Sequence, residues 1–133
     1  MDISKYDQNE AFLGGLEVRE AVLGPEYVKP SIENAADDPF MKTLQQFVTE
    51  TAWGTVWRRG VLDRKQRSLL NLAMLSAMGR EAELKLHTRG AINNGCTKEE
   101  IAEVFLQAAV YAGAPAAVSA FRIAKGVFDD MGV

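Results

Sequence analysis

The segment Arg64–Met78 contains neither Gly nor Pro, and leucine, alanine and methionine fill most of its positions. Asp63 precedes it as an N-cap, because a short carboxylate accepts hydrogen bonds from the free N–H groups of the first helical turn. Gly79 follows it and permits a break. The pattern predicts a helix that is apolar almost all round, and such a helix is buried in a core or an interface.

Polar side chains interrupt this apolar surface along one stripe. They are spaced three to four residues apart, which places them on one side of the helix, and they are Arg64, Arg67, Ser68 and Asn71. Polar groups inside a packed helical bundle need partners or a purpose. The stripe therefore indicates a polar site next to this helix.

A second helix is predicted from Arg80 to Asn94, and it carries the only histidine of the chain. Arg80, Glu83 and His87 stand at i, i+3 and i+7, within roughly 60° of one another. A carboxylate one turn before an imidazole fixes its tautomer and raises its basicity, so either group could move a proton. A solvated surface pair is the competing interpretation. The apolar neighbouring helix favours a site, in which the polar stripe faces His87.

The rest of the chain is predicted to form helices separated by Gly, Pro and capping residues. Helices are expected at 9–23, 28–35 and 39–53, from 98 onwards and from 115 onwards, with a loop at 54–62. Thr97 and Glu100 form a capping box, and Pro115 begins the last helix after Gly113. No segment shows the sustained alternation of a strand. The predicted fold class is all-α, with six or seven helices.

Length and composition limit the function further. The 133 residues, 47% hydrophobic and 25% charged, suit a single globular domain spanning 1–133. A net charge of −3 argues against a nucleic-acid partner. No apolar run reaches 18 residues and the start is polar, so we expect no membrane span and a cytoplasmic protein. Apolar, alanine-rich helix faces predict a homo-oligomer.

Metal and thiol chemistry lack the residues that they need. One His and one Cys, His87 and Cys96, are not a recognised metal-ligand set, and the acidic pairs at 37–38 and 129–130 are too sparse for Mg²⁺ or Ca²⁺. Cys96 has no second thiol nearby for a CxxC centre. We therefore expect no metal site and a structural role for Cys96.

Residues 49–125 contain the long pieces LDRK, SLLNLAML, ELKLH, RGAINNG and APAAV. They resemble the carboxymuconolactone decarboxylase family, and LGPEYV and ENAADDPF extend the resemblance over nearly the whole chain. The resemblance implies an alkylhydroperoxidase-D-like helical bundle, no cofactor, and assembly as trimers or hexamers. The implied carboxy-lyase reaction is loss of CO2 from γ-carboxymuconolactone, giving β-ketoadipate enol-lactone in bacterial protocatechuate degradation.

The peroxidase branch of the same superfamily differs at the helix that carries the histidine. Its CxxCxxxH motif matches Arg80 to His87, but Arg80 and Glu83 occupy the two cysteine positions here. A thiol peroxidase is therefore disfavoured. Residues 79–82, GREA, depart from the decarboxylase pattern, which leaves a decarboxylase or isomerase for a related lactone or keto acid as an alternative. A non-catalytic helical assembly protein is the other one.

Loss of CO2 from such a lactone leaves an electron pair that delocalises through the C=C bond onto the lactone carbonyl. The protein must hold a dianion, stabilise this oxygen and supply a proton. We assign His87 as proton donor or hydrogen-bond donor to the enolate, with Glu83 as its orienting partner. The candidates that bind the anionic lactone are Arg80, Arg67, Arg64, Trp53 and Trp57.

Overall fold

The computed structural model describes all residues of the chain, which divides into two compact units, Met1–Leu62 and Asp63–Val133. It contains seven α-helices, one π-helix and no strand, which confirms the all-α fold class. None of these helices is both long and apolar enough to cross a membrane. Each unit is described by itself, and the single domain expected from the sequence stays a prediction.

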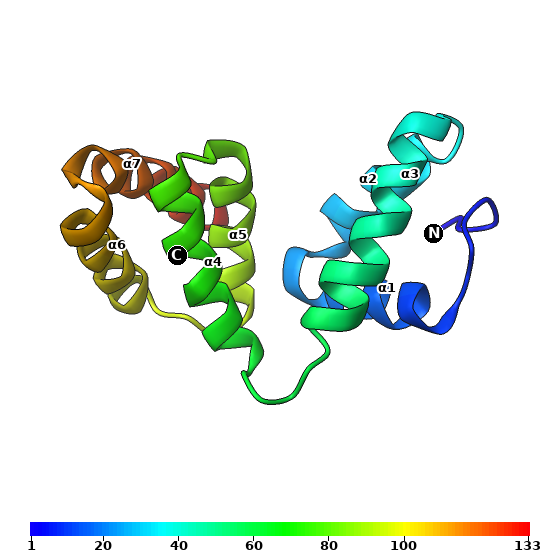
Figure 1. Cartoon of the computed structure of the whole chain (residues 1–133). Coiled ribbons are helices and arrows are strands. Elements are labelled where there is room, and N and C mark those ends of the chain that lie inside the picture. The colour runs from blue at the N-terminus through cyan, green and yellow to red at the C-terminus, as the bar shows by residue number, and fades with distance from the viewer. The chain divides into compact units, whose positions relative to one another are not determined.

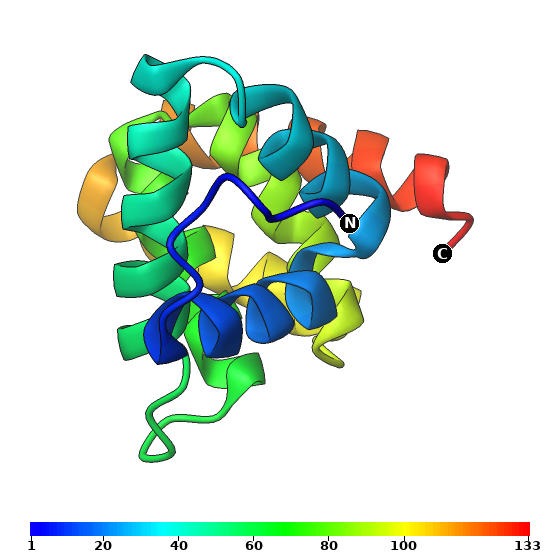
Figure 2. The same ribbon diagram turned by 90° about the vertical axis from the view of Figure 1, so that its right-hand side faces the viewer.

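The first unit consists of three α-helices and the π-helix. Their bounds are Glu10–Leu23 for α1, Pro25–Ala35 for α2, Pro39–Val48 for α3 and Thr49–Val56 for the π-helix η1. In Figure 1, α3 runs directly into η1. The segment between η1 and the next helix is an irregular loop in both Figure 1 and Figure 2.

Two boundaries in this unit differ from the sequence prediction. Helix α2 begins at Pro25 and not at Val28, because proline in the first helical turn loses no hydrogen bond. Residues 54–56, predicted as loop, continue the helix as part of η1. The glycine expected to end the helix, Gly54, instead permits a close approach between backbones.

Helices α1 and η1 form the centre of the first unit. A Cβ on Gly15 of α1 would collide with the carbonyl oxygen of Thr49, and a Cβ on Gly54 would collide with that of Ala11. The two backbones are therefore closer than side chains would allow.

The second unit consists of four α-helices. Their bounds are Arg64–Met78 for α4, Glu81–Asn93 for α5, Lys98–Ala112 for α6 and Ala114–Met131 for α7. Helix α4 packs against the other three. The core they share is Leu72, Leu84, Ala91, Cys96, Ile101, Phe105, Ala120 and Ala124.

The local signals that predicted these helices are present in the structure. Gln66 N–H donates to Asp63 at 2.7 Å, and Glu100 N–H donates to the Thr97 hydroxyl at 3.1 Å. In both capping boxes the Gln or Glu side chain also accepts from the backbone of the cap. Gly79 adopts the left-handed conformation, φ 68°, and ends α4.

Helix α4 is buried on one side only within this chain. Its buried residues are Ser68, Leu72 and Ser76. Leu70, Met74 and Met78 are about half exposed or more, at 49%, 52% and 61%. A core burial on all sides is therefore wrong for this chain, because three neighbouring helices cover only one face of α4. The interface that was the other possibility stays a prediction.

Candidate active site

The polar stripe of α4 faces α5, as predicted. Asn71 Nδ2 lies 3.3 Å from Nδ1 of His87. At the other end of the hairpin, the Asn94 amide donates to the hydroxyl of Ser68 at 2.8 Å and to the carbonyl of Arg64 at 3.3 Å. The two helices thus meet through polar contacts as well as through apolar packing.

Helical spacing explains why these contacts form. Ser68 and Asn71 are three residues apart on α4, so they share a face. His87 and Asn94 are seven residues apart, two turns along α5 and its C-cap. Gly79 lets the chain reverse, and an antiparallel hairpin brings the two faces together.

The environment of His87 keeps its ring neutral. Burial lowers the pKa of His87 to about 4, and the carboxylate of Glu83 opposes this by raising it. At neutral pH the imidazole can therefore donate one hydrogen bond and accept another. It does not act as a preformed imidazolium acid.

The free energy of unfolding should depend on pH through His87. Its ordinary pKa of 6.5 applies to the unfolded chain and about 4 to the folded one, so between these values the unfolded chain binds more protons. Stability should therefore fall as the pH drops from about 6.5 to about 4, by an amount on the order of 3 kcal/mol. Urea titrations at several pH values would measure it. The variant His87→Gln should lack this part of the slope, and equal slopes would contradict a buried neutral ring.

The other predicted site residues of the second unit differ in exposure. Arg67 is half-buried on the stripe, one turn before Asn71, whereas Arg64, Arg80 and Glu83 are exposed. Arg67 is therefore the arginine whose surroundings differ most from those of a surface residue.

Arg80 lines a cavity of about 320 Å³ at the start of α5 and α7. This volume is at the lower end of the range for small-molecule sites. The side chains around it include Ser76, Glu81, Leu84 and Ser119, and His87 is not among them. The cavity therefore brings in one predicted arginine without the predicted catalytic pair.

Trp53 and Trp57 belong to the first unit, where both lie on η1. Both are buried, and their rings stack with centroids 4.8 Å apart. Stacked, buried aromatic rings stabilise a core, and this accounts for both residues within the unit. Contact of either tryptophan with substrate stays a prediction.

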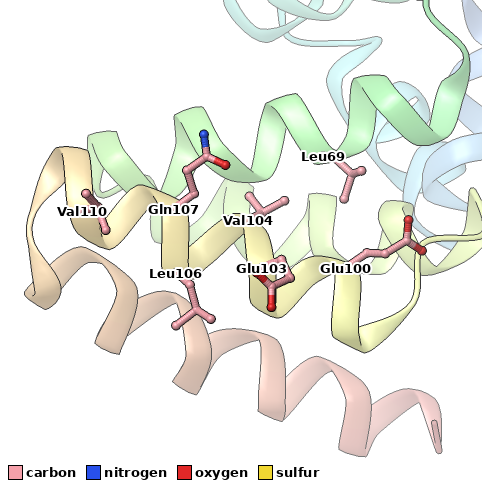
Figure 3. Close-up of a pocket in the computed structure, with 7 residues that line it drawn as sticks. All are labelled: Leu69, Glu100, Glu103, Val104, Leu106, Gln107 and Val110. Atoms are coloured by element: carbon pink, nitrogen blue, oxygen red, sulfur yellow. The ribbon is translucent and has the colours of Figure 1, made fainter.

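A larger hollow of about 530 Å³ lies along α6 (Figure 3). Leu69 of α4 and six residues of α6 line it, and the latter are Glu100, Glu103, Val104, Leu106, Gln107 and Val110. Two of the seven carry carboxylates, which repel an anion. This hollow contains none of the predicted site residues and does not suit an anionic substrate.

Cys96 has the surroundings of a structural residue. Its side chain is buried, its Sγ lies 3.7 Å from the carbonyl oxygen of Lys65, and burial raises the pKa of the thiol to about 11. A thiol of this kind is a poor nucleophile at neutral pH. No group of three or more His, Cys, Asp or Glu side chains is placed to hold a metal ion.

Sequence reasoning placed Asn71 on the polar stripe but gave it no role. The structure shows that it is the residue of α4 that meets His87. The signal was a lone amide in the middle of an otherwise apolar helix, where a polar group needs a partner.

A comparison with protein families places this arrangement in context. The model of the carboxymuconolactone decarboxylase family matches residues 42–126. The chain belongs to the carboxymuconolactone decarboxylase family. Its seven helices form the alkylhydroperoxidase-D-like fold expected of this family. The matched range includes His87, Asn71 and every other residue of the predicted site.

Two relatives with named activities are decarboxylases. Nitrosuccinic acid decarboxylase of Metarhizium robertsii is 50% identical over 117 residues, which cover 88% of this chain and 80% of the relative. The 4-carboxymuconolactone decarboxylase of Acinetobacter baylyi is 44% identical over 127 residues, which cover 96% of this chain and 93% of the relative. An uncharacterised 15.0 kDa protein of Paracoccus denitrificans is 33% identical over 104 residues, covering 74% and 78%.

Proposed function

We propose that this protein is a decarboxylase that removes CO2 from γ-carboxymuconolactone and gives β-ketoadipate enol-lactone. The observation that carries the proposal is the 44% identity, over nearly the full length of both chains, to a 4-carboxymuconolactone decarboxylase. The neutral His87, set against a polar helix stripe, is compatible with the chemistry that this substrate needs.

The reaction can proceed with the substrate as its own electron sink. The bond between the γ carbon and the carboxylate breaks, and its electron pair moves through the C=C bond onto the lactone carbonyl oxygen. The product of this step is a dienolate, which is then protonated on carbon. The protein lowers the barrier by holding the dianion and by stabilising the charge that develops on the oxygen.

His87 is the proposed donor to this oxygen. A neutral imidazole donates one N–H hydrogen bond, and the lowered pKa of His87 favours this role over proton transfer from an imidazolium. The proton that reaches carbon then comes from water. Glu83 influences the ring through its charge, which raises the pKa and strengthens the ring as an acceptor at its other nitrogen.

Arg67 is the proposed anchor for a substrate carboxylate, with Arg64 and Arg80 as further candidates. Guanidinium groups bind carboxylates through two parallel hydrogen bonds. Replacement of Arg67 by Gln should raise KM about tenfold or more, because one charge-assisted contact contributes roughly 1.5–3 kcal/mol. Steady-state kinetics would measure this, with Arg122→Gln on the exposed side of α7 as the control. An unchanged KM would exclude Arg67 as the anchor.

Nitrosuccinic acid is the second candidate substrate, because a decarboxylase of that acid is 50% identical to this chain. It is also a dicarboxylic acid. A nitro group beside the carbon that loses CO2 would accept the electron pair as a nitronate, so the same donor and the same cationic anchor would serve. The two candidates therefore share a chemical class: a dianion with an electron sink next to the breaking bond.

Parallel incubations with the two substrates decide between them. Purified protein is mixed with γ-carboxymuconolactone or with nitrosuccinate, and both loss of substrate and release of CO2 are followed. A higher kcat/KM with the lactone supports the proposal, and a higher value with nitrosuccinate replaces it with the second candidate. Turnover of neither, with the protein folded, would favour the non-catalytic assembly protein.

We also propose that the protein is a cytoplasmic homo-oligomer, a trimer or hexamer. Large apolar side chains remain exposed in both units, among them Phe40 at 83%, Val110 at 80% and Tyr111 at 85%. Exposed apolar surface of this kind is typical of subunit interfaces. Analytical ultracentrifugation would give the mass, and a monomer at micromolar concentration would contradict the proposal.

A further inference from the structure

The contact between α4 and α5 assigns a role to a residue outside the predicted catalytic pair. We propose that Asn71 is a positioning residue that holds His87 in the tautomer with its proton on Nε2. The tautomer itself follows from the geometry of the contact. Its consequence for catalysis rests on the decarboxylase function proposed above.

The chemistry of the two facing groups carries the inference. The Asn71 atom that faces the ring is Nδ2, 3.3 Å from Nδ1 of His87. An amide nitrogen is a donor only, so the ring nitrogen opposite it must accept. A neutral imidazole has one proton, and if Nδ1 accepts, that proton is on Nε2.

Surrounding contacts keep Asn71 at this position relative to the ring. Leu72, the next residue, is fully buried in the core of the unit. The Asn94 amide ties the end of α5 to α4 through Ser68 and the backbone of Arg64. These contacts limit sliding of α4 along α5, so the amide stays opposite Nδ1. The arrangement resembles an orienting group that fixes a histidine through one nitrogen while the other acts.

The position of Asn71 also changes the part assigned to Glu83. A carboxylate that oriented His87 through Nδ1 would require a proton on that atom, which would then face the N–H of Asn71. The two orienting roles at Nδ1 are therefore exclusive. Asn71 takes this role, and Glu83 acts on the ring through its charge.

This tautomer suits the proposed reaction. With Nδ1 held by Asn71, the ring presents an N–H at Nε2 as the donor to the oxygen of the dienolate. The opposite tautomer would present a lone pair at Nε2, which would repel the negative oxygen. Asn71 thereby determines whether His87 stabilises or destabilises the developing charge.

Nuclear magnetic resonance of the histidine ring tests the tautomer without any substrate. The chain has one histidine, so protein labelled with ¹⁵N-histidine gives a single set of ring signals. At mildly alkaline pH, where the ring is neutral, long-range ¹H–¹⁵N correlation should show an unprotonated Nδ1 and a protonated Nε2. A protonated Nδ1 in the wild-type protein would overturn the proposal.

Replacement of Asn71 by Asp gives the decisive variant. A carboxylate accepts only, so Asn71→Asp should move the proton to Nδ1 and reverse the pattern. The control is Leu70→Asp, which adds the same charge at the neighbouring, half-exposed position and should leave the wild-type pattern. Circular dichroism confirms that each variant folds. A wild-type pattern in folded Asn71→Asp would also overturn the proposal.

Kinetics then connects the tautomer to catalysis. Asn71→Asp should lower kcat for the accepted substrate about 10²-fold with little change in KM, because the donor and not the anchor is altered. A reversed tautomer with wild-type kcat would refute the catalytic consequence and leave the positioning role intact. If wild type turns over neither substrate, the proposed function fails, while the spectroscopic result still decides the tautomer.

Discussion

Replacement of His87 by Ala should lower the rate of lactone decarboxylation by about 10²–10⁴-fold, the range for a positioned acid–base or donor group. The variant loses the N–H that stabilises the dienolate oxygen, and no other imidazole exists in the chain to replace it. The loss should appear in kcat, because the arginines that hold the substrate carboxylates are unchanged. The measurement is the initial rate of lactone consumption together with CO2 release.

The matched control for this variant is Lys85→Ala, at an exposed position on the same helix α5. It should keep nearly wild-type activity. Both variants should retain the helical circular dichroism of the wild type, so that loss of activity is not loss of structure. Wild-type turnover by a folded His87→Ala protein would end the assignment of His87, although membership of the family would stand.

Replacement of Gly15 by Ala should destabilise the first unit by about 3 kcal/mol. The added Cβ would collide with the carbonyl oxygen of Thr49 and with the backbone of Gly54, and backbone atoms cannot move aside as a flexible side chain can. Both tryptophans of the chain, Trp53 and Trp57, are buried in this unit. Urea denaturation followed by tryptophan fluorescence therefore reports on this unit.

The control for this substitution is Gly126→Ala, in the interior of α7. No atom lies within 4 Å of the position its Cβ would take. Alanine has the higher helix propensity, so this variant should gain up to about 1 kcal/mol, seen by circular dichroism. An unchanged fluorescence midpoint in Gly15→Ala would show that α1 and η1 are not in backbone contact.

The helices of the second unit could be predicted from sequence because their ends are fixed locally. Asp63 and Gly79 are the N-cap and C-cap of α4, as predicted, since a cap depends on residues within one turn. Gly54 shows where such reasoning fails. A glycine that ends a helix and one that admits a neighbouring backbone have the same local propensity, and only the position of α1 distinguishes them.

The site was predicted to the same depth. Spacing along two helices sufficed to place the polar stripe of α4 opposite His87, because residues on one face follow a fixed period. The partner of His87 across the contact could not be chosen in this way. Spacing within α5 pointed to Glu83, whereas the structure places Asn71 of α4 at Nδ1. Which atoms meet depends on how far one helix is shifted along the other.

The burial of Cys96 makes the protein convenient for site-directed labelling. Its sulfur is buried and stays protonated at neutral pH, so maleimide dyes and spin labels should react with it slowly. A cysteine introduced at any exposed position would then be the one fast-reacting thiol. Distances within the assembled protein could be measured with the native residue left in place.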